Sequence, residues 1–316
     1  MNHPLVIPPG VPPTSHPEIA LNVGMIGVGK MGLPMARHFI RGGHRVSGYD
    51  ATLARISDAR QAGLETQDSV EALVGNTDIV LSSLPNDRAF ESVAQQVAQY
   101  ARPGQLYVDT STVSLAASRR VAQILSTAGV PYLRVAVSGN PQMIENAQLT
   151  SIASGTEHDY QRVLPLLRLL GPSQFYIGSG DESRVMKLVI NLMVASTAAT
   201  LAEALALGQR GGLEWQAMWD VICGSAVASP VVRSKAVQLK DYDFTPTFTV
   251  EQMQKDVGLI LETGESLHVP LRLTALVAQA LQHAVALGAA NDDYAALIKA
   301  AQHSAGLTLD ARKVQP

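Results

Sequence analysis

The sequence predicts an α/β domain followed by an all-helical domain, the two joined through a long helix. Three observations support this fold class. Short apolar segments alternate with helix-like segments from Leu21 to about Gly180, a pattern typical of a parallel sheet with helices on both faces. A long apolar segment without proline then extends from about 182 to 208, and its apolar residues nearly surround the predicted helix. The remaining sequence has helical periodicity, and 316 residues suffice for two such domains.

The expected elements follow in order along the chain. The first domain is expected to hold strands at 22–27, 44–50, 78–85, 105–111, 132–139, 149–155 and 174–178. A helix is expected at 30–41, where Met31, Met35 and Phe39 recur every four residues, and another passes through Val121 and Leu125. The second domain is expected to hold helices at 182–208, 214–223, 250–264, 272–287 and 293–303. These segments place the two domains at 21–180 and 181–316.

The composition narrows the classes of function. A share of 47% apolar and 16% charged residues provides a sizeable core. A net charge of −3 without a basic run argues against a nucleic-acid partner. The single cysteine, Cys223, excludes an intramolecular disulfide and a multi-cysteine metal site, and no metal is expected. No apolar run reaches about 18 residues without polar interruption, so no membrane span is expected.

The first twenty residues differ in character from the rest. They contain six prolines, which lack a backbone N–H and disfavour regular structure. The segment has neither the basic start nor the apolar core of a signal peptide. We therefore expect residues 1–20 to form a flexible arm and the protein to be cytoplasmic.

The segment GVGKMG, Gly27 to Gly32, lies between a predicted strand and a predicted helix. It fits the pattern G-x-G-x-x-G, which is specific in this context because it follows the first strand of an alternating α/β domain. Gly27 would permit a tight turn, Gly29 would let a pyrophosphate approach the backbone, and Gly32 would let helix and strand pack closely. The N–H groups at the helix start would then hold the phosphates, so the segment predicts a dinucleotide site.

Asp50 ends the second predicted strand, eighteen residues after Gly32. A carboxylate at this place accepts hydrogen bonds from the ribose hydroxyls of NAD and repels the 2′-phosphate of NADP. A second, compatible role is to cap the helix that follows. NAD is therefore the preferred cofactor, while NADP stays an alternative because Arg55 lies about one helical turn further on.

Further motifs follow the glycine segment in order. They are a strand ending in D-x-S-T, a V-S-G turn, a lysine and an asparagine four apart on the long helix, and a phenylalanine followed by K-D. The matching residues are Gly27, Gly29, Met31, Gly32, Met35, Ala36, Asp109, Ser111, Thr112, Val137, Ser138, Gly139, Lys187, Asn191, Phe248, Lys255 and Asp256. With these motifs in this order over residues 22–300, the chain resembles the β-hydroxyacid dehydrogenase family, which includes 3-hydroxyisobutyrate dehydrogenase.

This resemblance implies a Rossmann domain plus a helical domain, usually assembled as a homodimer or homotetramer. It implies a nicotinamide-dependent oxidoreductase that acts on a small β-hydroxy acid, with Lys187 as catalytic residue and Asn191 beside it on the substrate. Ser138 and Gly139 would bind the substrate carboxylate, next to Asn140. The expected cofactor contacts are Gly27, Val28, Gly29, Lys30, Met31, Gly32, Asp50, Leu84, Pro85, Ser111, Thr112 and Lys255.

The residue types themselves favour the same role for Lys187. Lys187 and Asn191 are four apart and share one helix face. A lysine on a nearly all-apolar helix is costly to bury unless it has a partner or a task. Partial burial would favour the neutral amine, which is the form that takes a proton from a substrate hydroxyl.

The sequence departs from the family in the segment after Ser138 and Gly139. In the segment 140–150, Asn140 replaces a glycine, and Pro141, Met143 and Asn146 replace small residues. The carboxylate pocket is therefore expected to differ from the usual one. Ile190 stands where the family has the first of two asparagines. Arg184, one turn before Lys187, would be either a further anion contact or, more simply, a surface arginine at a helix start.

Two other functions stay open at this stage. Imine reductases share the architecture but carry another residue at the lysine position. A nucleotide-binding module without catalysis would have lost the lysine. The presence of Lys187 argues against both, whereas the particular hydroxy compound, the direction of the reaction and the exact oligomer do not follow from the sequence.

Overall fold

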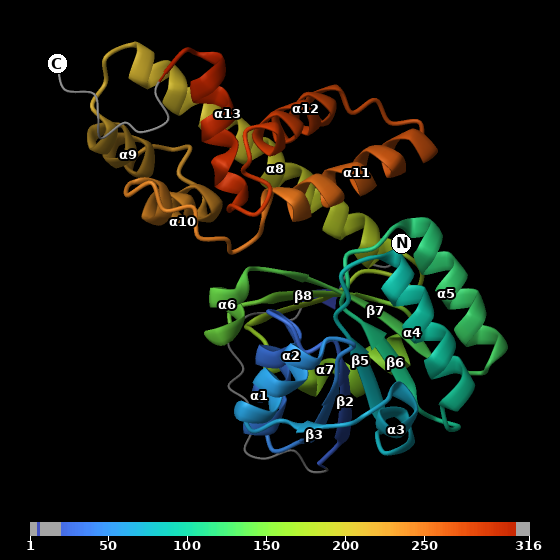
Figure 1. The fold of residues 1–316 in the computed structure, drawn as a ribbon. Helices are drawn as coiled ribbons and strands as arrows, with labels where there is room; N and C mark the ends of the chain where they lie inside the picture. Colours follow the sequence, from blue (N-terminus) through green and yellow to red (C-terminus); the bar gives the residue numbers. More distant parts are fainter. Residues whose placement is uncertain (1–4, 7–19, 308–316) are drawn as a thin grey trace. The chain divides into compact units, whose positions relative to one another are not determined.

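The computed structural model describes residues 5–6 and 20–307 and divides after Lys187 into two compact units (Figure 1). The predicted division near 181 lies one to two helical turns earlier in the sequence. The long helix α8, Glu182–Arg210, begins in the first unit and ends in the second.

The first unit contains, within the described residues, a nine-stranded sheet of order β1-β9-β8-β7-β6-β5-β2-β3-β4. Strand β3 pairs with one side of β2 and strand β5 with the other, so the order of the strands reverses at β2. Ligands of such sheets bind at the carboxyl ends of the strands around this point. The strands are β1 Leu5–Val6, β2 Asn22–Ile26, β3 Arg45–Tyr49, β4 Glu65–Thr66, β5 Ile79–Ser82, β6 Leu106–Asp109, β7 Tyr132–Ser138, β8 Thr150–Ser154 and β9 Ser173–Tyr176.

The prediction of a parallel sheet is correct from β4 to β7 and again for the pair β8–β9, but it is wrong at the pair β7–β8. Strand β8 runs antiparallel to β7, with Ser138 opposite Thr150. A parallel neighbour requires a crossover of about a dozen residues or more, usually through a helix that packs on the sheet. Between β7 and β8 the chain has only a short segment with the five-residue helix α6, Pro141–Glu145, so the strand turns back.

Part of the predicted arm also joins the sheet. Leu5 and Val6 form β1 and pair antiparallel with Tyr176 and Phe175 of β9. These two residues lie between prolines, each of which would interrupt a longer strand. Residues 1–4 and 7–19 of the arm lie outside the described residues.

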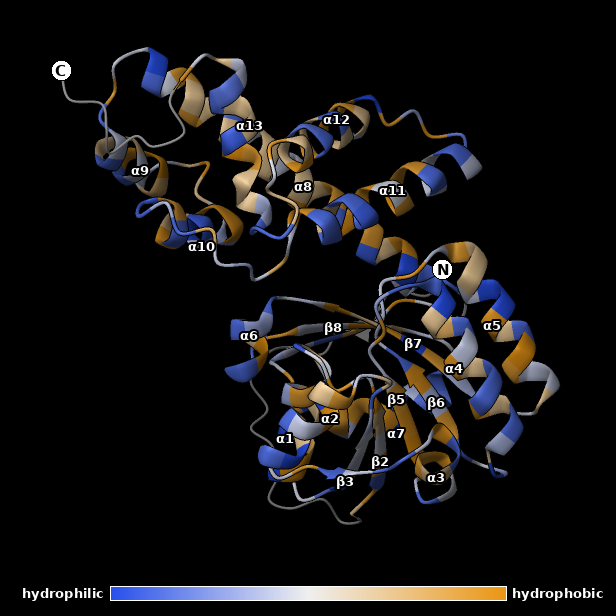
Figure 2. Cartoon of the chain, in the orientation of Figure 1, coloured by the Kyte–Doolittle hydropathy of each residue, from blue (hydrophilic) through white to orange (hydrophobic). Residues whose placement is uncertain are grey.

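Helices cover both faces of the sheet because alternate strand residues point to opposite sides. Val23 and Met25 of β2 pack with α1 and α7, whereas Ile26 packs with α3, α4 and α5. Figure 2 shows mainly apolar strands among helices that combine apolar and polar residues. The helices are α1 Gly32–Arg41, α2 Leu53–Gln61, α3 Val70–Gly75, α4 Asp87–Tyr100, α5 Leu115–Thr127 and α7 Glu157–Arg168.

The second unit is all-helical in the residues described, as the sequence predicts. Its core surrounds Trp219, Leu205 and Leu281. Helix α10 was not expected, since Ser229 and Pro230 interrupt the apolar pattern; the structure uses them as the N-cap and the first helical residue. The helices after α8 are α9 Trp215–Gly224, α10 Pro230–Leu239, α11 Val250–Ser266, α12 Arg272–Ala286, a 3₁₀ turn Tyr294–Ala296 and α13 Leu297–Ser304.

Helix α8 is, among the described residues, the one helix long and apolar enough to cross a membrane by length and composition. The sequence expectation required an apolar run that no polar residue interrupts. Helix α8 contains polar residues, but its mean hydropathy is still high enough to meet the criterion. The core helix of a soluble protein meets the same criteria. Ala195, Leu201 and Leu205 of α8 are buried in the core of the second unit, which accounts for part of its apolar surface.

Candidate functional site

The glycine segment connects β2 to α1 at the carboxyl edge of the sheet. Gly27 has φ +88° and its N–H donates to Tyr49 O at 2.8 Å. A Cβ on Gly27 would lie 2.3 Å from Ser83 O, and a Cβ on Gly32 would lie 1.9 Å from Gly27 O, so packing alone requires both glycines. A Cβ on Gly29 would meet only the Arg55 guanidinium, at 3.4 Å. The fold therefore leaves space for a side chain at Gly29, and a closely approaching ligand would explain why this position has none.

The start of α1 is suited to an anion. Its N-cap residue, Met31, offers no side-chain hydrogen bond, and the first turn has no acidic residue. The positive end of the helix dipole is therefore available to a phosphate. Lys30 is exposed directly before the helix, and Val28 is buried beneath the loop.

Asp50 is buried beside this loop. Its Oδ2 accepts a hydrogen bond from Val28 N at 3.1 Å, and its Oδ1 accepts one from Thr52 N at 2.9 Å. Each carboxylate oxygen accepts two hydrogen bonds, so both retain capacity for the ribose hydroxyls of a dinucleotide. Arg55 Nη1 lies 3.6 Å from Asp50 Oδ2 on the solvent side and partly balances the carboxylate charge. The residues present fit a nicotinamide dinucleotide.

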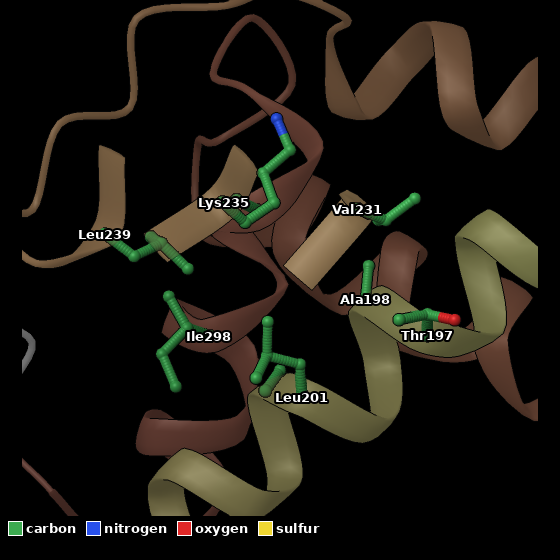
Figure 3. A pocket seen from close by; sticks show the side chains of 9 residues that line it. Thr197, Ala198, Leu201, Val231, Lys235, Leu239 and Ile298 are labelled. Atoms are coloured by element: carbon green, nitrogen blue, oxygen red, sulfur yellow. The ribbon is translucent and has the colours of Figure 1, made fainter. Parts of the chain in front are cut away.

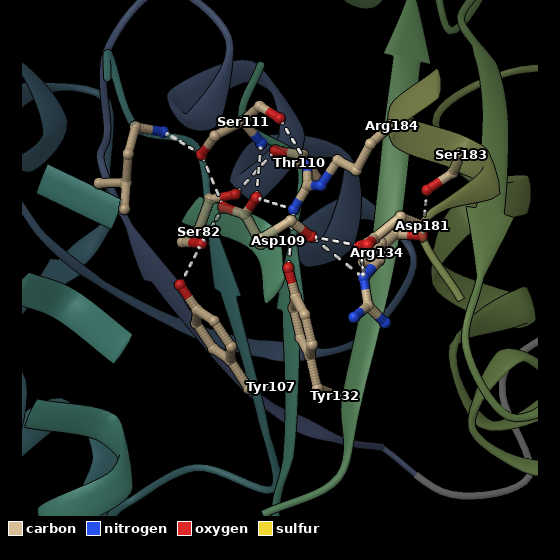
Figure 4. A network of polar contacts seen from close by, with 12 residues as sticks. Ser82, Tyr107, Asp109, Thr110, Ser111, Tyr132, Arg134, Asp181, Ser183 and Arg184 are labelled. Carbon is tan, nitrogen blue, oxygen red and sulfur yellow. Dashed lines mark hydrogen bonds and ion pairs between the residues drawn. The ribbon is translucent and has the colours of Figure 1, made fainter. Parts of the chain in front are cut away.

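The ends of β5 and β6 are held together by a buried carboxylate, Asp109 (Figure 4). Asp109 Oδ1 accepts hydrogen bonds from Ser82 Oγ and Ser111 Oγ, both at 2.6 Å. Ser111 Oγ in turn accepts from Leu84 N at 2.8 Å. The two predicted cofactor loops, Leu84–Pro85 and Ser111–Thr112, are therefore fixed to each other, and the Ser111 hydroxyl proton is committed to Asp109.

Tyr107, on β6, adds its hydroxyl to this network. Its hydroxyl lies 2.7 Å from Ser82 Oγ. Burial, and then the charge of Asp109, raise the pKa of Tyr107 well above its ordinary value. Tyr107 therefore stays protonated and is able to donate a hydrogen bond to Ser82.

Lys187 lies on α8 and its ammonium reaches the end of β7. Lys187 Nζ donates to Val137 O at 2.9 Å, one residue before Ser138. The structure thus brings the predicted catalytic lysine to the predicted carboxylate-binding turn, Ser138–Gly139, within the first unit.

The atypical segment after this turn is a short helix rather than a glycine-rich loop. Asn140 Oδ1 accepts from Met143 N at 2.9 Å and caps α6, so Asn140 has a structural task beside the substrate contact predicted for it. His38 Nε2 donates to Ile144 O at 2.7 Å and ties α6 to α1. Gly139 has φ +145°, and a Cβ there would lie 2.4 Å from Leu149.

The second unit contains the remaining predicted residues. Asn191 is buried, and its Nδ2 donates to Asp256 Oδ2 at 2.5 Å. Because a carboxylate only accepts, the asparagine oxygen points away from Asp256 and offers an acceptor. Lys255 Nζ lies 2.9 Å from Asp256 Oδ1. Asp256 therefore orients both Asn191 and Lys255.

Two residues of these networks were not assigned a role from the sequence, and a third, Arg184, lies elsewhere than on the expected surface. Asp109 and Asp256 were matched only as motif letters, although an acidic residue at the end of a buried strand was a signal for Asp109. Arg184 was expected to be an anion contact or a surface arginine. The surface position is wrong, whereas a contact with a substrate anion stays a prediction. Arg184 is 2% exposed and its Nη2 lies 2.5 Å from Asp109 Oδ2.

A small pocket lies inside the second unit, between α8, α10 and α13 (Figure 3). Its lining is apolar apart from Thr197 and the stem of Lys235, whose nitrogen points away from the pocket. None of the predicted site residues lines this pocket, and it is assigned to core packing.

Comparisons with known proteins match both parts of the chain to nicotinamide-binding families. The model of the NAD-binding domain of 6-phosphogluconate dehydrogenase matches residues 22–178. The model described as NAD-binding of NADP-dependent 3-hydroxyisobutyrate dehydrogenase matches residues 179–301. The chain therefore belongs to the β-hydroxyacid dehydrogenase family, as its motifs suggested, and is an NAD(P)-dependent oxidoreductase acting on the CH–OH group of hydroxy acids.

Individual relatives are similar over nearly their whole length. The 2-(hydroxymethyl)glutarate dehydrogenase of Eubacterium barkeri is 29% identical over 92% of this chain and 98% of its own. The chloroplastic glyoxylate/succinic semialdehyde reductase 2 of Arabidopsis thaliana is 27% identical over 91% of this chain and 82% of its own. The structure of 3-hydroxyisobutyrate dehydrogenase from Salmonella typhimurium is 27% identical, with a TM-score of 0.81 over 88% of this chain and 99% of its own.

Proposed function

We propose that the protein oxidises a β-hydroxy acid with NAD, or reduces the corresponding carbonyl acid with NADH, and that Lys187 transfers the proton. The observation that supports this most is the position of Lys187 Nζ, 2.9 Å from Val137 O and beside the Ser138–Gly139 turn. When bound, nicotinamide would accept the hydrogen of the carbinol carbon as hydride. The Lys187 amine would take the hydroxyl proton as the C–O bond becomes a carbonyl, and would give it back in the reverse direction.

The other residues would hold the substrate. Ser138 and the backbone at Gly139 would bind the carboxylate, and Asn191 would accept a hydrogen bond from the substrate hydroxyl through its oxygen. Because α6 and its cap Asn140 replace a glycine-rich loop, we propose a substrate bulkier or more polar than 3-hydroxyisobutyrate. The name of the Eubacterium barkeri relative makes 2-(hydroxymethyl)glutarate, a dicarboxylic β-hydroxy acid, a suitable candidate.

The test is cofactor reduction, followed by absorbance, over a panel of compounds. The panel contains 2-(hydroxymethyl)glutarate, 3-hydroxyisobutyrate, sugar acids and amino alcohols. We expect the highest kcat/KM on a β-hydroxy acid with a second polar group. Cyclic imines are tested separately, through the oxidation of NADH or NADPH. Turnover of these imines alone would instead identify an imine reductase, and cofactor binding without turnover of any compound would identify a non-catalytic module.

Cofactor choice is the next prediction. We expect a larger kcat/KM with NAD than with NADP, because Asp50 repels the 2′-phosphate. Arg55 opposes this preference, so Arg55→Ala should increase the ratio in favour of NAD, and Asp50→Asn should reduce it. Steady-state kinetics of the three proteins with both cofactors test this. A wild-type preference for NADP would contradict the role given to Asp50.

The glycine segment provides a prediction that separates binding from folding. Gly29→Ala should leave the melting temperature close to that of the wild type, because its Cβ meets only the mobile end of Arg55. It should weaken NAD binding at least tenfold, since the methyl group occupies the path of the pyrophosphate. Gly32→Ala, the control, should lower the melting temperature, because its Cβ would collide with Gly27 O. Equal NAD affinity in Gly29→Ala and wild type would show that the phosphates do not bind beside Gly29.

We also propose a homodimer or homotetramer. In the second unit Met193 and Leu207 of α8 are 65% and 76% exposed, and large apolar side chains of α10 and α12 are similarly exposed. Apolar surface of this kind is typical of an interface between subunits. Light scattering at micromolar concentration should show an oligomer, and Met193→Lys should weaken it, whereas Leu53→Lys on α2 should not. A monomeric wild type would refute the assembly.

A further inference from the structure

The start of α8 is anchored to the first unit by polar contacts of three residues, Asp181, Ser183 and Arg184, of which the last two are buried. Asp181 Oδ1, just before the helix, lies 2.8 Å from Arg134 Nε on β7. Ser183 Oγ bonds Ser154 Oγ of β8 at 2.9 Å. Arg184 reaches furthest into the unit, to the loop after β6 (Figure 4).

Arg184 joins three different groups through its guanidinium. Nη1 donates to Ser111 O at 2.5 Å, and Nη2 donates to Asp109 Oδ2 at 2.5 Å and to Tyr132 OH at 2.9 Å. Burial alone would lower the pKa of Arg184, but Tyr132 and Asp109 outweigh it and raise the pKa, so the side chain stays charged. The result is a rigid link between the Ser111 loop and α8.

Stability alone does not account for this arginine. A buried ion pair seldom adds net stability over an apolar pair of similar volume. Arg184 Nε is moreover buried without a hydrogen-bond partner among the residues described, which is itself unfavourable. The position of Arg184 is more informative: it is three residues, about one turn, before Lys187 on the same helix.

We propose that Arg184 is a positioning residue that fixes Lys187 relative to the loop after β6, where the cofactor is expected. This inference rests on the proton-transfer role proposed for Lys187. The Arg184–Asp109 pair holds the first turn of α8 against the carboxyl end of β6, and the next turn then delivers Lys187 Nζ to Val137 O. Small displacements of a reacting group cost up to about 10²-fold in rate.

The test is a double-mutant cycle of kcat between Arg184 and Lys187. Arg184→Lys keeps the positive charge beside Asp109 and so protects the fold, but its single nitrogen does not replace the two that Arg184 uses. We expect it to lower kcat about tenfold in the wild-type background and less than twofold in Lys187→Ala, because the group being positioned is then absent. Single-turnover rates, melting temperature and circular dichroism are measured for each protein.

The matched control is Lys235→Arg, which exchanges the basic residue of the other buried ion pair, Lys235–Asp293, in the second unit. It should leave kcat unchanged. A tenfold loss in both backgrounds would show that Arg184 acts independently of Lys187 and would overturn the positioning role alone. Full activity of Arg184→Lys would overturn it as well. Full activity of Lys187→Ala would instead remove the proposed function and the positioning role together.

Discussion

Replacing Lys187 with alanine is expected to lower kcat for oxidation by about 10²–10⁴, the usual loss for a general acid–base group. The affinity for NAD should change by no more than a few-fold. The glycine segment and Asp50 hold the dinucleotide, and neither depends on the lysine. Steady-state kinetics give kcat, and fluorescence titration gives the Kd of the cofactor.

Two further variants separate proton transfer from charge. Lys187→Arg keeps the positive charge but should not restore activity, since a guanidinium does not release its proton near neutral pH. Lys240→Ala removes a half-buried lysine paired with Asp220 on the second unit and should retain the wild-type kcat. Near-wild-type turnover by Lys187→Ala would remove the lysine from the mechanism.

The largest expected effect on stability is at Asp293. Asp293 is fully buried, and its Oδ1 accepts from Lys235 Nζ at 2.7 Å. Its Oδ2 accepts from both Thr247 N and Thr247 Oγ1. Burial lowers the pKa of Lys235, and Asp293 opposes this shift, so the ammonium depends on the carboxylate. Asp293→Ala should reduce the free energy of unfolding by about 3–5 kcal/mol, because a buried charge is left without a partner.

Urea denaturation of the paired variant distinguishes charge from packing. Lys235→Met with Asp293→Asn removes both charges, and the Met side chain remains against the apolar pocket that the Lys235 stem lines (Figure 3). This double variant should lose less stability than Asp293→Ala alone. If the double variant were the less stable of the two, the hydrogen bonds to Thr247 rather than the buried charge would control the loss.

Much of the fold was predictable because apolar periodicity reports which face of an element is buried. The buried strands β2, β5 and β6 are short apolar segments, and the helix α8 is mostly apolar and lacks proline, so all four were found directly. The direction of β8 was not, since period-two alternation is the same in parallel and antiparallel strands. The short α6, which decides that direction, lacks enough residues to show helical periodicity. Helix α10 was not predicted because it begins at Ser229 and Pro230, and these residue types occur in loops as well as at helix starts.

Residues of the candidate site were predictable where only one residue type fits the backbone. Gly27 and Gly32 are required by backbone contacts below 2.5 Å, and these are what the glycine pattern encodes. Partnership between distant residues was not predictable. Arg184 and Asp109 are 75 positions apart, and nothing in the local sequence distinguishes this buried arginine from an exposed one. The cap formed by Asn140 likewise depends on a helix that the sequence did not indicate.

The most direct test of the central claim is the pH dependence of single-turnover oxidation, with NAD saturating and the best β-hydroxy acid as substrate. The amine of Lys187 must be free to accept the hydroxyl proton, so the wild-type rate should rise with pH to a plateau. Lys187→Ala should be slower throughout and should lack this rise. The same rising limb in both proteins would show that another group takes the proton and would contradict the account.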